Sequence, residues 1–152
     1  MNRRDLLAAS ASAAAANAVW ALTGCGAQST GTPVEHPPSQ HLAPIDDLVA
    51  RASECALACE LCVARSVEHA GMGMADMAAC ARLSRECAEL CRAVIVLATA
   101  GSSRLPDLAR ICAGACDECA AQCQTHATME PACARCAEIC PACASACRAA
   151  AA

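Results

Sequence analysis

The sequence of 152 residues contains no Phe, no Tyr and no Lys, and its single Trp, Trp20, lies near the N-terminus. An ordinary soluble domain buries large side chains to offset the entropy lost on folding, and beyond Trp20 this chain has no aromatic ring for that purpose. The chain is nevertheless 57% hydrophobic, which excludes an intrinsically disordered protein. With 11 basic residues against 15 acidic ones, no basic surface favours a phosphate backbone, so we predict no nucleic-acid partner.

Cysteine is the residue that the chain has in excess, at 16 positions. Small disulfide-stapled proteins are typically rich in loops, Gly and Pro, whereas these cysteines lie in Ala-rich stretches that favour helices. If Cys25 belongs to a leader, as argued next, 15 cysteines remain, an odd number that complete disulfide pairing cannot use. Thiols are therefore expected to take the place of a normal apolar core.

The N-terminus has the features of an export signal. Arg3 and Arg4 form a twin-arginine start, and a mildly apolar, Ala-dominated run follows them. The stretch Leu-Thr-Gly-Cys that ends at Cys25 resembles a bacterial lipobox, in which this cysteine is lipidated and becomes the new N-terminus. We predict export by the twin-arginine route to the periplasm or to a lipid anchor on the membrane, with residues 1–25 as the signal.

Two other interpretations of the leader stay open. Ordinary signal peptidase could cleave after Ala21 or Ala27, or the segment could be a short Ala-rich helix that carries two arginines by chance. The Pro-rich composition of residues 26–44 is typical of a linker. We therefore predict that the folded domain occupies residues 45–152.

Within that domain the cysteines recur at intervals of three and four residues, which return a side chain to the same face of a helix. Gly-rich breaks and Pro residues suited to first turns divide the domain into predicted helices at about 45–69, 74–100, 105–127 and 129–150, the last one capped by Thr128. Short connections favour antiparallel neighbours. The predicted fold is all-α, an antiparallel up-down-up-down four-helix bundle with a Cys-lined core.

Pro141 lies inside the fourth predicted helix, where we expect a bend rather than a break. Ser84 occupies a place in the second cysteine stripe that the period assigns to a thiol. The predicted metal ligands are the stripe cysteines Cys55, Cys59, Cys62, Cys80, Cys87, Cys91, Cys112, Cys116, Cys119, Cys123, Cys133, Cys136, Cys140, Cys143 and Cys147.

The spacing of the thiols discriminates between the metals that they could bind. A ferredoxin-type cluster needs a C-x2-C-x2-C run, which the sequence lacks around Cys136 and Cys140. Zinc prefers closed groups of four sulfurs, whereas continuous stripes offer an unbroken ladder. Copper(I) is soft and accepts two or three thiolates, so neighbouring sulfurs can each bridge two ions. We predict multiple Cu(I) ions per chain, on the order of a dozen, at roughly one per thiolate.

Softer donors gather at one end of the predicted bundle, which we call the mouth. They are expected to pass Cu(I) inward, because thioether and imidazole bind this ion more weakly than thiolate does. In the alternative interpretation the methionines fill gaps in the core and the histidines are helix C-terminal charges. The mouth residues are His69, Met72, Met74, Met77, His126 and Met129. An apolar plug is predicted at the opposite end, from Leu48, Val49, Val94, Ile95, Leu97, Leu105 and Leu108.

The domain resembles the bacterial copper storage proteins. The resemblance rests on the spacings Cys55-x3-Cys59-x2-Cys62, Cys112-x3-Cys116-x2-Cys119-x3-Cys123 and Cys133-x2-Cys136-x3-Cys140-x2-Cys143-x3-Cys147, together with the segment from His69 to Met77. The family implies a four-helix bundle that binds many Cu(I) ions through inward-pointing cysteines. The twin-arginine leader is similar to that of the exported members, for which the family implies homo-oligomers.

We therefore expect a non-enzymatic protein that stores or buffers Cu(I) outside the cytoplasm, because no base lies beside a single privileged thiol. Copper ions, further copies of the chain, and copper donor or acceptor proteins are the expected partners, and a lipid anchor is the expected link to a membrane. The alternatives left open are a thiol-disulfide redox protein and a structural zinc-binding helical bundle.

Overall fold

The computed structural model describes residues 43–152, which fold as four α-helices without a strand in that range. They are α1 (Ala43–Gly71), α2 (Met77–Thr99), α3 (Leu105–Gln124) and α4 (Pro131–Ala150). The leader, its predicted lipidation site Cys25 and nearly all of the predicted linker lie outside the described residues. No helix of this described part is long and apolar enough to cross a bilayer.

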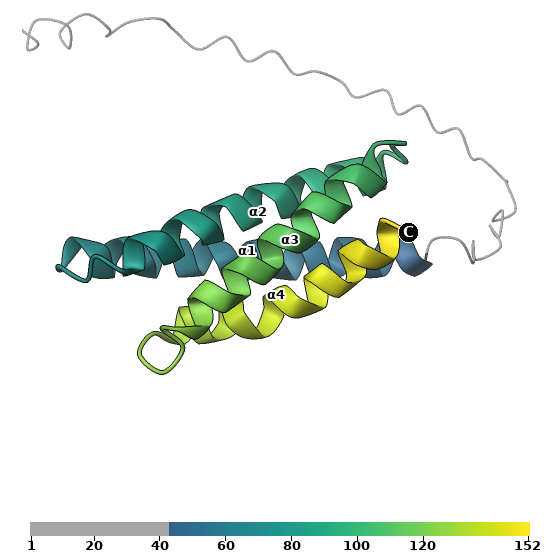
Figure 1. Cartoon of the computed structure of the whole chain (residues 1–152). Helices are drawn as coiled ribbons and strands as arrows, with labels where there is room; N and C mark the ends of the chain where they lie inside the picture. Colours follow the sequence, from purple (N-terminus) through teal and green to yellow (C-terminus); the bar gives the residue numbers. More distant parts are fainter. Residues whose placement is uncertain (1–42) are drawn as a thin grey trace, which may run out of the picture. The chain divides into compact units, whose positions relative to one another are not determined.

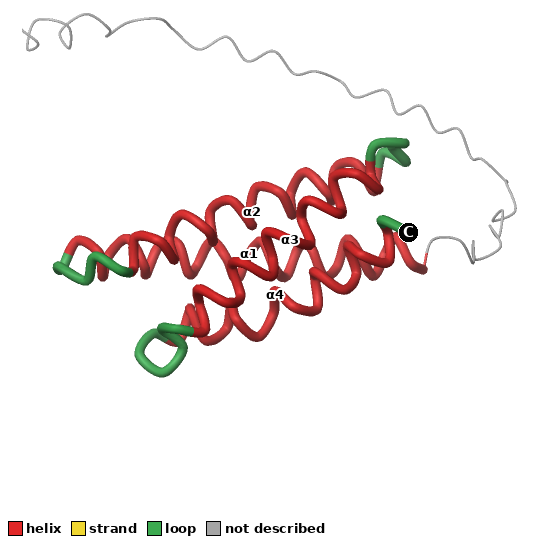
Figure 2. Tube along the Cα trace, in the orientation of Figure 1, coloured by secondary structure: helices red, strands yellow, loops and turns green. Residues whose placement is uncertain are grey.

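The helices form a four-membered ring in which α1 packs against α2 and α4, and α3 packs against the same two helices. The connections 72–76 and 125–130 lie at one end of the bundle, and the connection 100–104 lies at the other (Figure 1). The tube in Figure 2 shows that each connection reverses the chain direction. The predicted antiparallel four-helix bundle is confirmed.

The helix ends follow local chain chemistry. Gly101 adopts a φ of 61° just after α2, and the Ser102 N–H donates to the Leu97 carbonyl at 3.0 Å, which closes this helix end. The fourth predicted helix begins at residue 129, two residues before α4 begins, because residues 125–130 form a turn before Pro131. The prediction of Thr128 as its cap is wrong: Glu130 is the N-cap, and its side chain accepts a hydrogen bond from the Ala132 N–H.

Pro141 lies in the middle of α4, and the helix continues through it without a break. The proline side chain is exposed, so its ring lies on the outer surface of the bundle rather than in the core. Proline removes one backbone hydrogen bond of the helix, and the packing of α4 against its neighbours must offset that loss. The cysteine stripe therefore keeps its register from one end of α4 to the other.

Charged side chains cover the outside of the bundle. Several ion pairs join neighbouring helices, and because these side chains are largely exposed, each contributes little to stability. The pairs between helices are Arg85 and Arg92 with Glu60, Arg135 with Glu54, and Arg148 with Asp117.

Candidate metal centre

The core of the bundle consists mainly of sulfur. All 15 predicted ligand cysteines are fully buried, and none of those in residues 43–152 forms a disulfide. The spacing of three and four residues turns each stripe toward the bundle axis, where Ala side chains fill the space between sulfurs. The structure thus brings together every cysteine that the sequence assigned to a metal.

One group of four sulfurs lies next to the mouth, and each helix contributes one of them. We call this group the mouth quartet: Cys62, Cys80, Cys123 and Cys133. Its Sγ–Sγ contacts range from 3.3 Å, between Cys80 and Cys123, to 3.6 Å, between Cys62 and Cys123. It shares no cysteine with the other quartets in the described part of the chain.

The next four quartets share cysteines and form a continuous chain along the axis. Within each quartet the Sγ atoms lie within 4.8 Å of one another. The four are Cys59/Cys119/Cys136/Cys140, Cys55/Cys59/Cys87/Cys140, Cys55/Cys87/Cys91/Cys116 and Cys91/Cys112/Cys116/Cys143. Together they contain ten different cysteines, which we call the quartet chain. An ion in one quartet therefore uses sulfurs that also belong to the next.

Cys147 is, within residues 43–152, the one cysteine outside these quartets. It lies beyond Cys143 at the far end of the core, where the bundle is closed by apolar side chains instead of sulfur. Of the seven predicted plug residues, Leu48, Val94 and Leu105 are buried, and the other four are partly buried and pack against the core. The predicted apolar plug is confirmed.

Two serines also line the sulfur core. Ser84, noted in the sequence as an interruption, is fully buried, with its Oγ 3.5 Å from the Cys119 sulfur and 3.6 Å from the Cys123 sulfur. It therefore lies between the quartet chain and the mouth quartet. Ser66, which the sequence argument missed, is fully buried one turn after Cys62. Its position four residues along the same stripe was the signal that could have identified it.

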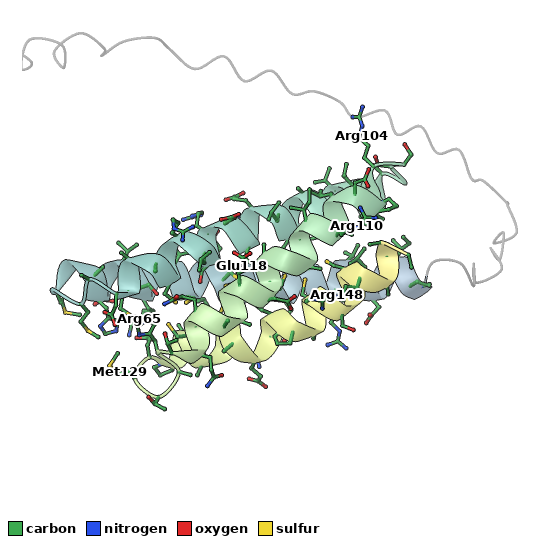
Figure 3. All side chains as sticks on the ribbon, in the orientation of Figure 1. Arg65, Arg104, Arg110, Glu118, Met129 and Arg148 are labelled. Carbon is green, nitrogen blue, oxygen red and sulfur yellow. The ribbon has the colours of Figure 1, made fainter. Side chains whose placement is uncertain are left out.

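The soft donors of the mouth are not equally placed. Met77 is fully buried and packs into the core, as the gap-filling interpretation expects, and Met74 is half-buried. Met72 and Met129 are exposed, with 64% and 56% of their surface accessible, and Figure 3 shows Met129 at the loop end of the bundle. The exposed thioethers are therefore the ones that an ion in solvent can reach.

The two histidines of the mouth contact carboxylates. His126 is buried, with Nδ1 3.9 Å from the Asp76 carboxylate. His69 is partly buried, with Nε2 2.7 Å from a carboxylate oxygen of Glu130. Glu130 is itself buried, and the Ala132 N–H holds the pKa of its carboxyl below the usual range, with a further contribution from His69. Sequence reasoning missed this glutamate, because only the fold brings it to His69.

Two thiols, Cys133 next to the mouth and Cys147 at the far end of the core, have raised pKa values. Burial raises the pKa of the Cys133 thiol, and the nearby Cys62 and Cys80 sulfurs raise it further. Contacts with the Cys112 and Cys143 thiols raise the pKa of Cys147, and burial adds to this. A metal ion that binds here must therefore displace protons.

A family model described as copper storage protein matches residues 42–152, which is the whole described bundle. The chain belongs to the copper storage protein family. Its bundle is similar to two solved structures of copper storage protein 3 from Bacillus subtilis. The copper-free structure is 29% identical, with a TM-score of 0.63 over 70% of this chain and 98% of that one. The Cu(I)-bound structure is 27% identical, with a TM-score of 0.64 over 72% and 99%.

A curated relative, the uncharacterised cysteine-rich protein YhjQ of Bacillus subtilis strain 168, is 30% identical over 73 residues. That match covers 48% of this chain and 66% of the relative, slightly less than two thirds of its length. The resemblance inferred from the cysteine spacing is confirmed, and the family is one of storage proteins rather than enzymes. The description of the family names copper as the cargo, and the buried sulfur quartets of this chain could hold metal ions.

Proposed function

We propose that this protein stores several Cu(I) ions along its core, with all 15 buried cysteines as ligands, and buffers copper outside the cytoplasm. The observation that carries the proposal is the chain of quartets that share sulfurs. A shared sulfur can bridge two Cu(I) ions, so a continuous chain of thiolates favours many ions rather than one. The Cu(I)-bound relative of the same fold supports this choice of metal.

Zinc is a second candidate because the mouth quartet is closed and compact. Zn²⁺ binds four thiolates in a tetrahedron and does not need shared ligands. Among the described quartets, at most three can be filled without sharing: the mouth quartet, Cys59/Cys119/Cys136/Cys140 and one further group around Cys91 and Cys116. The two metals therefore predict different capacities.

Titration of the reduced protein under anaerobic conditions tests the proposal. With Cu(I) we expect saturation on the order of a dozen ions per chain, at roughly one per thiolate. With Zn²⁺ we expect no more than three ions, the number of separate quartets. Saturation after one or two Cu(I) ions would contradict storage, and a Zn²⁺-bound protein that resists displacement by Cu(I) would favour the structural zinc bundle.

The redox alternative needs a thiolate that a partner can reach, since thiol-disulfide exchange proceeds by direct attack on sulfur. All 15 thiols are fully buried, which argues against it. Reaction of the copper-free protein with a soluble aromatic disulfide distinguishes the two functions. We expect slow modification limited by opening of the bundle, whereas fast reaction of one cysteine pair would support the redox function.

For location, we propose export by the twin-arginine route, followed either by lipidation of Cys25 or by cleavage after Ala21 or Ala27. Mass spectrometry of the mature N-terminus tells these products apart. Replacing Arg3 and Arg4 with Lys is expected to keep the protein in the cytoplasm. If the parent protein, with Arg3 and Arg4 in place, were found in the cytoplasmic fraction with an intact leader, this result would contradict export.

The proposed partners are a copper donor, a copper acceptor and further copies of the chain. Sedimentation of the mature protein tests self-association, and a monomer at micromolar concentration would contradict it. The store serves either as a reserve for copper enzymes or as protection against excess copper. A deletion strain discriminates these roles, because loss of a reserve impairs growth at low copper and loss of protection impairs growth at high copper.

A further inference from the structure

The two histidines at the mouth differ in the state of their ring nitrogens. His126 has Nδ1 near the Asp76 carboxylate and Nε2 3.5 Å from the Gln122 side-chain amide. His69 has Nε2 in contact with Glu130, while its Nδ1 is buried without any hydrogen-bond partner. A buried polar atom without a partner costs stability, so its presence in a folded protein calls for an explanation such as ligand binding. Among the described side chains, this is the one buried nitrogen or oxygen in that condition.

Glu130 is held so that it faces His69. One carboxylate oxygen accepts the Ala132 N–H at 2.9 Å, and the other lies 2.7 Å from the His69 Nε2. An ionised carboxylate only accepts hydrogen bonds, so the Nε2 of His69 must be the donor. In the neutral ring, Nδ1 then carries a lone pair and no proton. Carboxylates orient metal-binding histidines in proteins in this way.

The position of this pair in the bundle connects it to the sulfur core. His69 lies two helical turns after Cys62 in α1, and Glu130 lies three residues before Cys133 at the start of α4. The Cys62 and Cys133 sulfurs are 3.5 Å apart in the mouth quartet, and the buried Ser66 hydroxyl contacts both. Beyond the mouth quartet along these two helices, His69 is therefore the next side chain with a nitrogen that could bind a metal ion.

We propose that Glu130 is a positioning residue that keeps the Nδ1 lone pair of His69 free, so that His69 rather than His126 receives Cu(I) before the mouth quartet does. This inference rests on the proposed storage of Cu(I). The ion moves from nitrogen to a thiol sulfur, and the thiol proton leaves to solvent, so copper stays in the Cu(I) state. Imidazole holds Cu(I) less tightly than thiolate, which makes the transfer favourable.

The variant Glu130→Gln tests the proposal. Its amide oxygen can still accept the Ala132 N–H, but its NH₂ group then faces Nε2, which must become the acceptor. The proton moves to Nδ1 and removes the free lone pair. We expect ¹⁵N NMR of the copper-free proteins to report Nε2–H in the parent and Nδ1–H in the variant. Loading from a Cu(I)–chelator complex should slow about tenfold, with unchanged final capacity.

Further variants provide a control and test which histidine is used. Glu68→Gln removes an exposed carboxylate that pairs with Arg65, and it should load at the parent rate. His126→Gln removes the other mouth histidine, and it should slow loading less than His69→Ala does. His69→Ala should load as slowly as Glu130→Gln, and the double variant should be no slower than either. Circular dichroism checks that each variant is folded.

Two results would overturn the proposal: an Nδ1–H tautomer in the parent, or equal loading rates for Glu130→Gln and the parent. Slow loading by His126→Gln together with normal loading by His69→Ala would show that His126 receives the ion. That result would also overturn the proposal. A parent that takes up no Cu(I) would instead refute the proposed function. The tautomers of the copper-free proteins remain measurable in that case, so the two failures are distinguishable.

Discussion

At the scale of the residue, cysteine takes over the role that large aliphatic side chains have in most bundles. A thiol is small and weakly polar, so it packs beside alanine without an unsatisfied hydrogen-bonding group of high cost. Each sulfur also remains a strong ligand once its proton is lost. A residue other than cysteine at a stripe position therefore interrupts the series of ligands, and Ser84 is the clearest example.

Replacing Ser84 with Cys should join the mouth quartet to the quartet chain. The new sulfur would occupy the position of a hydroxyl that already lies 3.5 Å and 3.6 Å from two sulfurs. We expect the Cu(I) capacity to rise by about one ion, because each bridging thiolate adds about one. Titration against a competing chelator measures this. The matched control Ser84→Ala should keep the parent capacity, and a Ser84→Cys capacity equal to that of the parent would show that the position does not take part in binding.

Sequence reasoning identified the 15 cysteines because a helix turns every third or fourth residue to one face. It did not identify Glu130, since a pairing between residues 61 positions apart depends on how two helices meet. It grouped all six soft donors of the mouth together. The structure separates a fully buried Met77 from an exposed Met129, because exposure near a turn depends on where each helix begins.

At the scale of the element, α4 tolerates a proline that should weaken it. The helix runs from Pro131 to Ala150 with Pro141 near its middle. The sequence predicted this continuity, but it placed the start of the helix two residues too early, because a glutamate side chain can cap where Thr128 was the expected choice. The period of a helix can be predicted from sequence, whereas the residue at which the helix begins or ends depends on local hydrogen bonds.

The change Pro141→Ala should stabilise the copper-free protein. It restores a backbone N–H in the helix interior, where proline costs about 3 kcal/mol, while the added freedom of the unfolded chain reduces the gain by about 1 kcal/mol. We expect a net increase of about 2 kcal/mol in the free energy of unfolding, measured in urea. Pro131→Ala is the matched control, because the first position of a helix has no hydrogen bond to restore. A gain from Pro131→Ala as large as that from Pro141→Ala would contradict this explanation.

At the scale of the whole molecule, the bundle has two different ends joined by a sulfur core. Soft donors and two buried or half-buried histidines lie at one end, and aliphatic side chains close the other. We propose that this polarity gives the ions one direction of filling, from the mouth inward. It also places many ionisable thiols in a volume with little water, so copper loading and protonation must be coupled.

Loading should therefore release protons and weaken in acid. The raised pKa values of Cys133 and Cys147 keep these two thiols protonated at neutral pH. A Cu(I) ion that binds to them must displace their protons, and its apparent affinity should fall as the pH falls. A pH-stat titration should record about one proton per ion.

The same pKa shifts predict how the stability of the copper-free bundle depends on pH. A thiol whose pKa is raised by folding stabilises the folded state below its ordinary value of 9.0, and this contribution is lost as the pH rises through the raised value. Ionisation of Cys133 and Cys147 should therefore lower the free energy of unfolding above pH 9, and replacing both with Ala should reduce that pH dependence. Loading without proton release, or a bundle that gains stability above pH 9, would indicate thiolates that are already ionised.

X-ray absorption at the copper edge of the fully loaded protein tests the central claim most directly. If the ions share the thiolates of a continuous core, the nearest neighbours of copper should be sulfur alone, and a copper–copper scattering contribution should appear beyond them. Oxygen or nitrogen as the dominant nearest neighbours, or isolated ions without copper neighbours, would contradict storage in the sulfur core.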